Sequence, residues 1–305
     1  MALSVITRRR ELLIFLKEQK SMGKSIGFVP TMGALHEGHG KLISQSASEN
    51  DCTVISIFVN PKQFGPKEDF SKYPRTFHDD MNVAEHHGAQ VIFTPTIEEM
   101  FPSTFQTQVI VQGISEVLCG QYRPGHFNGV TTVVLLLLNL MQPHKMYLGQ
   151  KDFQQLQVIR KMIDDLALHT EIVMVPTVRE QDGLALSSRN RYLSPASRKK
   201  ASAIPKALAV IAKSYLSGEK SVEKLFKIAS SELNKENLIP QYFEFRSTAL
   251  LTQKCEILVD KEAVVAIAII IEFEGTCTRL IDNIVLGNDS ASTNALTDLI
   301  AKALG

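Results

Sequence analysis

The amino-acid sequence predicts an α/β protein, in which a parallel sheet with helices on both faces precedes a smaller α+β domain. Through about the first 175 residues, strand-like apolar runs alternate with helical patterns. These runs are almost continuously apolar, which is typical of parallel strands buried on both faces. After about Leu193 the alternation stops, and helical segments precede strand-like stretches, as in an α+β domain. The expected domains are therefore 1–185 and 186–305.

Helical segments separate the strands of the expected sheet, as right-handed crossovers between parallel strands require. The expected strands are 25–30, 52–60, 90–95, 145–149 and 171–176. The expected helices are 39–50, 76–87, 129–141 and 153–168. Near the N-terminus, the buried face of a short amphipathic helix is expected to hold Leu12, Leu13, Phe15 and Leu16. Because ligands bind outside the carboxyl ends of the strands in such sheets, the residues that follow each strand are the candidates for a site.

The second domain is expected to begin with helices and to end with strands. The helices are expected at 196–217 and 221–234, and the strands at 241–247, 255–260 and 263–273. Within the first domain, the connection at 61–75 is unusually long and carries three prolines and one glycine. Loops of that length inside a compact domain are usually lids or binding loops, and this one directly follows a central strand.

Composition excludes several classes of protein. The 305 residues carry a formal net charge of +1, so no overall basic field favours nucleic acid. The four cysteines form no C-x-x-C pair, which indicates a reduced compartment. The longest apolar run, 263–271, is far shorter than the roughly 20 residues that cross a bilayer. We therefore expect a soluble, cytoplasmic protein with no membrane or nucleic-acid partner.

The stretch "VPTMGALHEGHGKL" places two histidines, His36 and His39, where a strand gives way to a helix. A zinc hydrolase would carry H-E-x-x-H, with its ligands four apart on one helical face. Here the histidines are three apart, Gly38 lies between them, and no third ligand stands at a recognisable spacing. A metal site is therefore disfavoured, while a phosphate site and two merely solvated histidines stay open.

A phosphate site agrees better with this turn. Gly33 and Gly38 have the G-x-x-x-x-G spacing of a P-loop, although His39 follows where a P-loop has lysine. A strand, a glycine-bearing turn and a helix N-terminus together present free N–H groups and partial positive charge to an anion. That dipole favours the neutral imidazole, which can still donate one N–H to a phosphate oxygen in a transition state.

Two further stretches strengthen the phosphate hypothesis. "LGQKDFQQ" ends a strand and opens a helix, so that Lys151 can neutralise phosphate and Asp152 can accept from ribose hydroxyls or hold Mg²⁺. "DGLALSSRN" follows the last parallel strand and offers donors for a leaving pyrophosphate in Ser187, Ser188 and Arg189. Three such sets at the carboxyl ends of one sheet indicate a nucleoside triphosphate.

With these motifs the sequence resembles the pantothenate synthetase (pantoate–β-alanine ligase) family of H-x-G-H nucleotidylyl transferases. The resemblance covers essentially the whole chain and keeps the order of the family's motifs. Those motifs are "PTMGALHEGH", "FVNPKQFGPKEDFSKYPRT", "LCGQYRPGHFNGV", "LGQKDFQQLQVIRKM", "DGLALSSRNRYLS" and "TRLIDN". It implies a Rossmann-like first domain, with the second domain closing over the active site, and a homodimer.

The resemblance implies two half-reactions. Pantoate attacks the α-phosphate of ATP and yields pantoyl adenylate and pyrophosphate. The ATP is expected to bind together with Mg²⁺. The amine of β-alanine then attacks the acyl carbon and yields pantothenate and AMP. An adenylate is readily hydrolysed, so the 61–75 loop is expected to fold over the intermediate and exclude water.

The family's roles carry over position by position. Gln63 and Gln155 are expected to hold pantoate, with Gln63 also near the entry of β-alanine, and His39 is the family's proton donor. The expected catalytic residues are His36, His39, Lys151, Ser187, Ser188 and Arg189. The expected ATP-binding residues are Met32, Gly33, Ala34, Leu35, His36, Glu37, Gly38, His39, Gly149, Gln150, Lys151, Asp152, Val178, Leu186, Ser187, Ser188 and Arg189. Arg123 and His126 are expected to border the substrate pocket, and Asp79 is the candidate Mg²⁺ ligand.

Two positions depart from the family pattern: Gly40 follows the H-x-G-H where a larger residue is usual, and Leu186 stands where methionine is common. Gly40 touches no proposed role, leucine has a volume similar to that of methionine, and neither departure changes the expected chemistry. One alternative is another acyl-adenylating ligase or nucleotidylyl transferase on the same fold. A second is an inactive nucleotide sensor, which would not need the complete catalytic set. An NAD-dependent enzyme is disfavoured because no G-x-G-x-x-G follows a strand.

Overall fold

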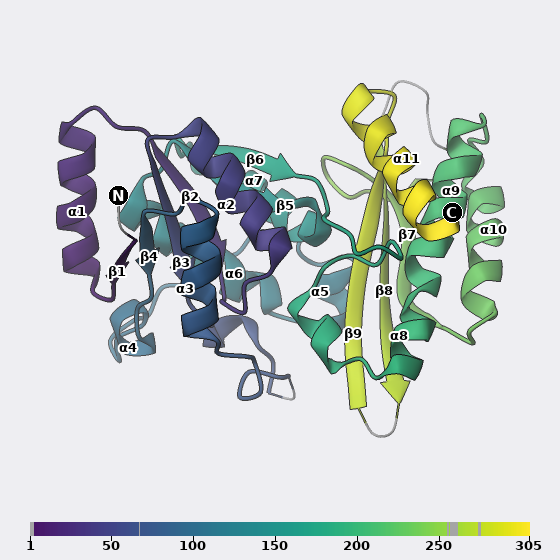
Figure 1. The fold of residues 1–305 in the computed structure, drawn as a ribbon, viewed down its shortest axis with the longest axis horizontal. Helices are drawn as coiled ribbons and strands as arrows, with labels where there is room; N and C mark the ends of the chain where they lie inside the picture. Colours follow the sequence, from purple (N-terminus) through teal and green to yellow (C-terminus); the bar gives the residue numbers. More distant parts are fainter. Residues whose placement is uncertain (1–2, 67, 255, 257–261, 274–275) are drawn as a thin grey trace. The chain divides into compact units, whose positions relative to one another are not determined.

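The structure is a computed structural model that describes residues 3–66, 68–254, 256, 262–273 and 276–305. Its chain forms two compact units (Figure 1). The first unit comprises Met1–Glu116, Arg123–Gln150 and Val158–Val175, and the second comprises Val117–Tyr122, Lys151–Gln157 and Pro176–Gly305. The sequence placed the domain boundary after residue 185, whereas from Pro176 onward the whole chain belongs to the second unit. Two short segments of the earlier chain also pack with that unit.

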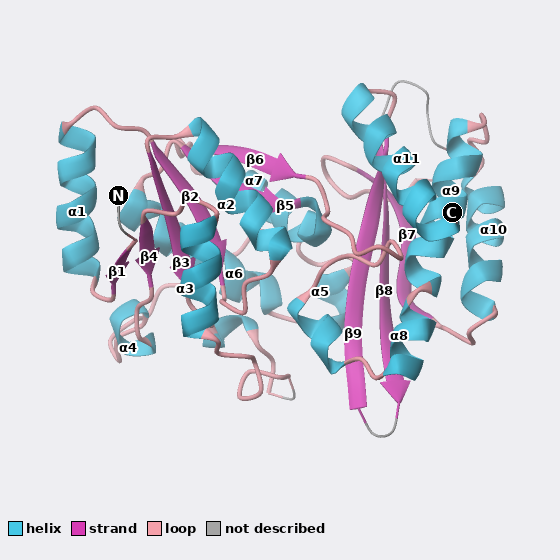
Figure 2. Ribbon diagram, viewed as in Figure 1, coloured by secondary structure: helices cyan, strands magenta, loops and turns pink. Residues whose placement is uncertain are grey.

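The first unit contains a six-stranded parallel sheet with the order β1-β4-β3-β2-β5-β6 (Figure 2). The strands are β1 (Ser4–Ile6), β2 (Ile26–Thr31), β3 (Cys52–Ile57), β4 (Val91–Phe93), β5 (Lys145–Gly149) and β6 (Glu171–Val175). The five strands expected from the sequence are confirmed within a few residues. The sixth, β1, was not expected, because Ser4 and Val5 are exposed, whereas the equally short β4 is apolar and buried throughout; β1 exists through its pairing with β4.

Helices cover this sheet. They are α1 (Arg9–Ser21), α2 (Glu37–Glu49), α3 (Phe77–His86), the short α4 (Ile97–Met100), α6 (His126–Met141) and most of α7 (Phe153–Asp165). Helix α2 packs against β2, β3 and β5, and α1 packs against α6. In α1, Leu12 and Leu16 are buried as expected, but Leu13 is 46% exposed and Phe15 is only half-buried. The buried face of α1 is thus narrower than the four residues expected, because a helix turns about 100° per residue and Leu13 falls outside the buried stripe.

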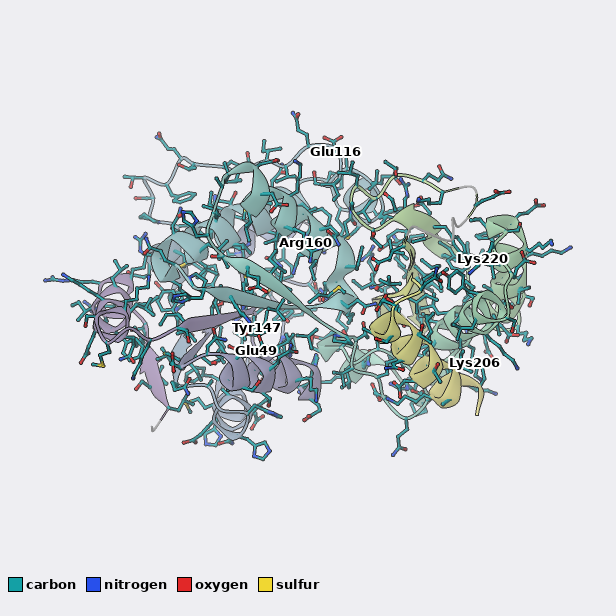
Figure 3. The ribbon with its side chains drawn as sticks, turned by 90° about the horizontal axis from the view of Figure 1, so that it is seen from above. Glu49, Glu116, Tyr147, Arg160, Lys206 and Lys220 are labelled. Carbon is teal, nitrogen blue, oxygen red and sulfur yellow. The ribbon has the colours of Figure 1, made fainter. Side chains whose placement is uncertain are left out.

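At the C-terminal end of α2, a buried tyrosine is paired with two polar residues that reach the surface. Tyr147 of β5 is completely buried, and its hydroxyl donates to Glu49 Oε2 at 3.0 Å and accepts from Asn50 Nδ2 at 2.7 Å (Figure 3). Burial raises the pKa of the Tyr147 phenol to about 12. The phenol therefore stays neutral and serves as a structural hydrogen bond.

The second unit is built on the antiparallel sheet β7-β8-β9. Its strands are β7 (Pro240–Ser247), β8 (Ala263–Phe273) and β9 (Thr276–Leu286). Its helices are α5 (Cys119–Tyr122), α8 (Pro195–Ala201), α9 (Ala203–Leu216), α10 (Val222–Asn234) and α11 (Ser290–Leu304). Helix α9 packs against α10, α11 and β9, and it provides much of the apolar core.

Most of the expected elements of the second domain are confirmed. The expected helix 196–217 is divided at Ser202 into α8 and α9, and the expected strands 241–247 and 263–273 correspond to β7 and β8. Except for Glu256, the expected strand 255–260 lies outside the described residues. β9 was not expected, because Arg279, Asp282 and Asn283 interrupt its apolar pattern. α11 was not expected either. The predicted fold class is confirmed: a helix-flanked parallel sheet and a smaller α+β unit.

Candidate functional site

The turn that follows β2 is held in place by one buried carboxylate. Gly33 and Ala34 have positive φ angles of 83° and 51°, so the backbone reverses sharply before α2 begins. Asp80, which is 1% exposed on α3, accepts from Ala34 N at 3.1 Å and from Leu35 N at 2.8 Å. Thr76 Oγ1 donates to the same carboxylate at 3.1 Å. A Cβ on Gly33 would lie 2.9 Å from Asp80 Oδ2, so the turn needs glycine for contact as well as for its φ angle.

The two histidines cap the helix that this turn opens. His36 is the N-cap of α2, and its Nδ1 accepts from Gly38 N at 3.1 Å. His39 Nδ1 accepts from His36 N at 3.3 Å, and the two ring centroids lie 4.2 Å apart. Each Nδ1 receives a backbone N–H, so the neutral form of each ring carries its proton on Nε2. The cap thereby fixes both tautomers and makes Nε2 the donor of each ring.

Gly40, which departs from the family pattern, accommodates another histidine. A Cβ on Gly40 would lie 2.3 Å from His87 Nε2. The His87 ring accordingly packs over the first turn of α2, with Nδ1 2.9 Å from Ser44 Oγ and Nε2 3.5 Å from Glu37 Oε2. A larger side chain at position 40 would therefore have to displace this ring.

The pantoate motif that follows β3 meets the turn that follows β2. Gln63 ends the short helix η1 (Pro61–Gln63), and its Nε2 lies 3.1 Å from Met32 Sδ. The Gln63 Oε1 accepts from Asn60 Nδ2 at 3.0 Å. The same Asn60 Nδ2 donates to Gly129 O at 3.1 Å. A Cβ on Gly129 would lie 2.2 Å from Lys62 O, so helix α6 packs directly on the backbone of η1. Met32 and Gln63, predicted as ATP and pantoate residues, thus lie side by side.

Arg123 and His126 hold the 61–75 loop from the start of α6. Arg123 makes a two-pronged ion pair with Glu68, with distances of 2.7 and 2.5 Å. His126 Nδ1 donates to Gln63 O at 2.8 Å, and its Nε2 accepts from Arg123 Nη1 at 3.1 Å. Burial raises the pKa of the Glu68 carboxyl, but hydrogen bonds and charge from Arg123 outweigh it and leave the pKa below its ordinary value. Both residues predicted at the pocket border therefore contact the backbone or side chains of the loop.

Asp79, the candidate Mg²⁺ ligand, is exposed on α3, while its neighbour Asp80 points inward. Both oxygens of Asp80 accept hydrogen bonds within the turn. Within the described part of the chain, no cluster of three or more His, Cys, Asp or Glu side chains could hold a metal ion. The described residues thus do not form a protein cage for Mg²⁺.

In the second unit, the residues after β5 include two glutamines with different surroundings. Gln154 is buried, and it accepts from Cys119 N at 2.9 Å and donates to Val117 O at 2.7 Å. Gln155, predicted to hold pantoate, is half-buried one position later. Lys151 Nζ lies 3.7 Å from Asp152 Oδ2, in the short helix η2 (Gln150–Asp152) that follows Gly149 at the end of β5. The buried glutamine is occupied with backbone, which leaves Gln155 as the candidate for a ligand.

The other predicted ATP segment of the second unit is a hairpin followed by a short helix. Leu186 N donates to Val178 O at 2.9 Å, and Arg179 forms a bridge with Ala185. Ser187 then caps the helix η3 (Ser188–Tyr192), because its Oγ accepts from Arg189 N at 3.3 Å.

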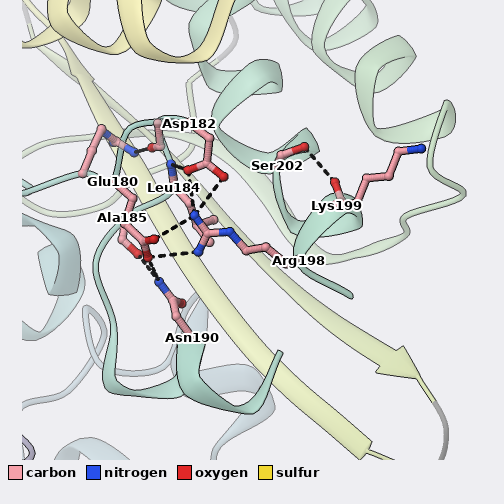
Figure 4. A network of polar contacts seen from close by, with 10 residues as sticks. Glu180, Asp182, Leu184, Ala185, Asn190, Arg198, Lys199 and Ser202 are labelled. Carbon is pink, nitrogen blue, oxygen red and sulfur yellow. Dashed lines mark hydrogen bonds and ion pairs between the residues drawn. The ribbon is translucent and has the colours of Figure 1, made fainter. Parts of the chain in front are cut away.

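Side chains reinforce this hairpin (Figure 4). Asn190 Nδ2 donates to Glu180 Oε1 at 2.7 Å and to Ala185 O at 3.1 Å. Arg198 of α8 forms ion pairs with Glu180 and Asp182, each at 2.8 Å. Asn190 and Arg198 therefore stabilise the hairpin and, with it, the segment of Leu186, Ser187, Ser188 and Arg189 that leads into η3.

Sequence reasoning missed several residues that hold these segments. Asn60 and Asp80 lie within or beside recognised motifs, but neither was given a role. Arg179 lies next to a predicted ATP residue, and Asp282 and Asn283 end the "TRLIDN" motif. The signal for Asp282 and Asn283 is that they are adjacent polar residues within a strand, which is costly when they are buried unless each group finds a partner.

The fold and the capped turn define the class of this chain, an α/β nucleotide-binding enzyme with the H-x-G-H signature. The family profile described as pantoate-beta-alanine ligase matches residues 4–285. The chain is 46% identical to the pantothenate synthetase of Acetivibrio thermocellus over 283 residues, covering 92% of this chain and 99% of that protein. It is 48% identical to the pantothenate synthetase of Caldicellulosiruptor saccharolyticus over 283 residues, again covering 92% and 99%. The chain belongs to the pantoate-beta-alanine ligase family.

Solved structures agree with this family. The crystal structure of pantothenate synthetase from Thermus thermophilus has a TM-score of 0.86 and 39% identity, covering 94% of this chain and 100% of that chain. The pantoate-beta-alanine ligase from Francisella tularensis, complexed with beta-gamma ATP and beta-alanine, has a TM-score of 0.73 and 30% identity, covering 94% and 99%. No described helix is both long and apolar enough to cross a membrane.

Proposed function

We propose that this enzyme condenses pantoate with β-alanine at the expense of ATP, through a pantoyl-adenylate intermediate. The family supports the overall reaction, and the pantoate-beta-alanine ligase from Francisella tularensis was solved in complex with beta-gamma ATP and beta-alanine. The observation that carries the proposal is the contact between Met32 and Gln63, which brings the predicted ATP turn and the predicted pantoate motif together.

The first step is transfer of the adenylyl group. A pantoate carboxylate oxygen attacks the α-phosphorus of ATP, a new P–O bond forms, and the bond to the β-phosphate oxygen breaks to release pyrophosphate. His36 and His39 donate from Nε2 to phosphate oxygens as charge develops, because the cap occupies each Nδ1. In the second unit, Lys151 and the hairpin residues Ser187, Ser188 and Arg189 bind phosphate and stabilise the leaving pyrophosphate.

The second step is aminolysis of the intermediate. The neutral amine of β-alanine attacks the acyl carbon, the bond from that carbon to the phosphate oxygen breaks, and AMP leaves as the amine loses its proton. Gln63 and Gln155 hold pantoate through amide groups that can pair with both carboxylate and hydroxyl. Arg123 and His126 act through the Gln63 carbonyl and Glu68, and so keep the 61–75 loop in place.

Mg²⁺ bound with ATP would neutralise phosphate charge. Of the two neighbouring aspartates, Asp79 is exposed and would be the residue to contact it, whereas Asp80 is committed to the turn. A homodimer and a cytoplasmic location also remain predictions from the family resemblance and the sequence.

The test is ATP consumption by the purified protein, with pyrophosphate and AMP measured separately. We expect pyrophosphate release to depend on pantoate, and steady AMP production to require β-alanine as well. A response to other carboxylic acids in place of pantoate would favour another acyl-adenylating ligase on this fold. Binding of ATP with no pyrophosphate release under any of these conditions would favour a nucleotide sensor.

A further inference from the structure

The "TRLIDN" motif occupies the middle of β9, and its last two residues are an unusual pair. Asp282 and Asn283 are each 3% exposed, and their partners on β8 are Ile267 and Ala266. Successive residues of a strand point to opposite faces of the sheet. One strand therefore presents a buried carboxylate on one face and a buried amide on the other, which is unfavourable unless both are hydrogen-bonded.

Asp282 binds the base of the hairpin that carries the predicted pyrophosphate residues. Arg179 Nη1 and Nη2 donate to Asp282 Oδ2 and Oδ1 at 2.7 and 3.0 Å, and the two side chains are 6% and 1% exposed. The same guanidinium donates to Gly183 O at 3.0 Å and to Asn283 O at 3.3 Å. Arg179 thus ties both strands of the hairpin to β9. Helix η3, which follows the hairpin, also packs against β9.

Asn283 binds the other predicted ATP segment of this unit. Its Nδ2 donates to Lys151 O at 2.9 Å, directly at the residue whose ammonium is proposed to neutralise phosphate. Its backbone N–H donates to Asp282 Oδ1 at 2.7 Å. Asp282 therefore accepts from Arg179 and from Asn283 at once, so the two contacts share one carboxylate.

We propose that Arg179, Asp282 and Asn283 are positioning residues that set the spacing between Lys151 and the hairpin carrying Ser187, Ser188 and Arg189. We name these three residues the β9 clamp. The proposal rests on the proposed function, because it assigns the clamp to the ATP phosphates. The described hydrogen bonds of the clamp go to the backbone at Lys151 and Gly183 and not to the amides of Gln63 or Gln155, so the clamp should affect ATP and pyrophosphate more than pantoate.

Asn283→Ala tests the clamp with the smallest disturbance, since it removes the amide donor to Lys151 and keeps the Arg179–Asp282 pair. We expect the KM for ATP to rise about tenfold, as for loss of one well-formed hydrogen bond. The KM for pantoate is expected to change less than twofold. Arg179→Lys keeps the charge but loses the fork, and it should raise the KM for ATP in the same direction.

The double variant Arg179→Lys/Asn283→Ala sharpens this test. Because Arg179 donates to the Asn283 carbonyl and to the carboxylate that the Asn283 backbone N–H also binds, the two substitutions disturb one network, and the effect of the double variant on the KM for ATP should be smaller than the product of the two single effects. Glu244→Gln is the matched control: it weakens a half-buried ion pair with Arg246 on β7 of the same unit, and it should leave both KM values unchanged.

The outcomes separate the clamp from a general role in folding and from the proposed function. Equal changes in the KM for ATP and for pantoate, or loss of kcat alone with both KM values unchanged, would overturn the clamp. Titration calorimetry with a non-hydrolysable ATP analogue gives a second measurement, in which Asn283→Ala should bind about tenfold more weakly than wild type. If wild type releases no pyrophosphate with pantoate, the proposed function fails. If wild type is active and Asn283→Ala matches it, only the clamp fails.

Discussion

The two units hold their candidate phosphate-binding residues by different means. In the first unit, the H-x-G-H turn is stabilised by backbone N–H groups, which bind the rings of His36 and His39 and the carboxylate of Asp80. In the second unit, the hairpin and Lys151 are stabilised by side chains of β9, through a buried ion pair and an amide. In the first unit the histidine caps join residues two or three positions apart and the Asp80 contacts span 45 and 46 positions, whereas the contacts of β9 in the second unit join residues more than a hundred positions apart.

This difference indicates how each part should respond to substitution. The turn combines locally specified φ angles and histidine caps with its contacts to Asp80, so loss of that one carboxylate removes only part of its support. The hairpin has local support from Asn190 and Arg198, but its attachment to β9 depends on one buried charge pair, and removal of one partner leaves the other charge buried. We therefore expect the largest losses in the second unit.

The largest expected effect is that of Asp282→Ala. Arg179 would remain buried without its carboxylate, and breaking such a pair costs about 3–5 kcal/mol of unfolding free energy. Urea unfolding followed by circular dichroism measures the change. Arg179→Met/Asp282→Leu, which replaces both partners by apolar groups, should recover most of the stability but not the KM for ATP. A loss below about 1 kcal/mol for Asp282→Ala would show that the pair is not the main support of the hairpin.

Asp80→Ala is expected to have the next largest effect. Two backbone amides of the turn and Thr76 Oγ1 would lose their acceptor, with a cost of about 2–4 kcal/mol. The KM for ATP should rise, because Ala34 and Leu35 lie in the predicted ATP turn. Asp79→Ala is the matched control on the same helix, and its exposed side chain should leave stability within about 0.5 kcal/mol of wild type. Equal destabilisation by both variants would contradict the role assigned to Asp80.

Gly129→Ala distinguishes the substrates within the first unit. The added methyl group would meet the backbone at Lys62 O, and such overpacking costs about 1–3 kcal/mol. Because η1 carries Gln63, the KM for pantoate should rise while the KM for ATP changes little. Gly65→Ala adds the same methyl group within the 61–75 loop itself, at ordinary contact distances of 3.7 Å or more, and it serves as the control. An increase in the KM for ATP alone would remove the assignment of this segment to pantoate.

The smallest expected effect at neutral pH concerns the ion pair between Arg123 and Glu68. The pKa of Glu68 is lowered in the folded chain, so its contribution is complete above its ordinary pKa of 4.5 and is lost as pH falls through the folded value. Protection factors of the amides in the 61–75 loop, which correct for the pH dependence of intrinsic exchange, should therefore fall below pH 4.5. Glu68→Gln should show the lower protection factors already at neutral pH. Protection factors that are independent of pH in wild type while circular dichroism shows a folded chain would contradict this assignment.

The sequence by itself determined the parallel sheet and the composition of the candidate site. Strands β2, β3, β4 and β5 were predictable because strands covered on both faces are apolar throughout. The turn and helix start at His36 and His39 could also be predicted, since a strand, glycines and a helix N-terminus are adjacent in the chain. The family's motifs assigned Gln63, Gln155, Lys151 and the Ser187–Arg189 segment, although no contact beyond their own segments could be read from them.

Only the tertiary structure decided which of two similar neighbours faces inward. Asp80 is buried and Asp79 exposed, and Gln154 is bound to backbone while Gln155 is half-buried. A shift of one residue rotates a side chain by about 100° on a helix, and no periodic pattern of apolar residues fixes that angle precisely enough for a single polar residue. The packing of α3 and α7 against their neighbours fixes it.

The tertiary structure also decided the long-range partners. β9 was not expected as a strand because Asp282 and Asn283 interrupt its apolar pattern, and their partners Arg179 and Lys151 lie more than a hundred residues earlier. Glu68 and Arg123 are likewise separated by 55 positions. A charged residue in a sequence is compatible with many partners, and burial selects one of them because an unpaired charge inside the protein is strongly unfavourable.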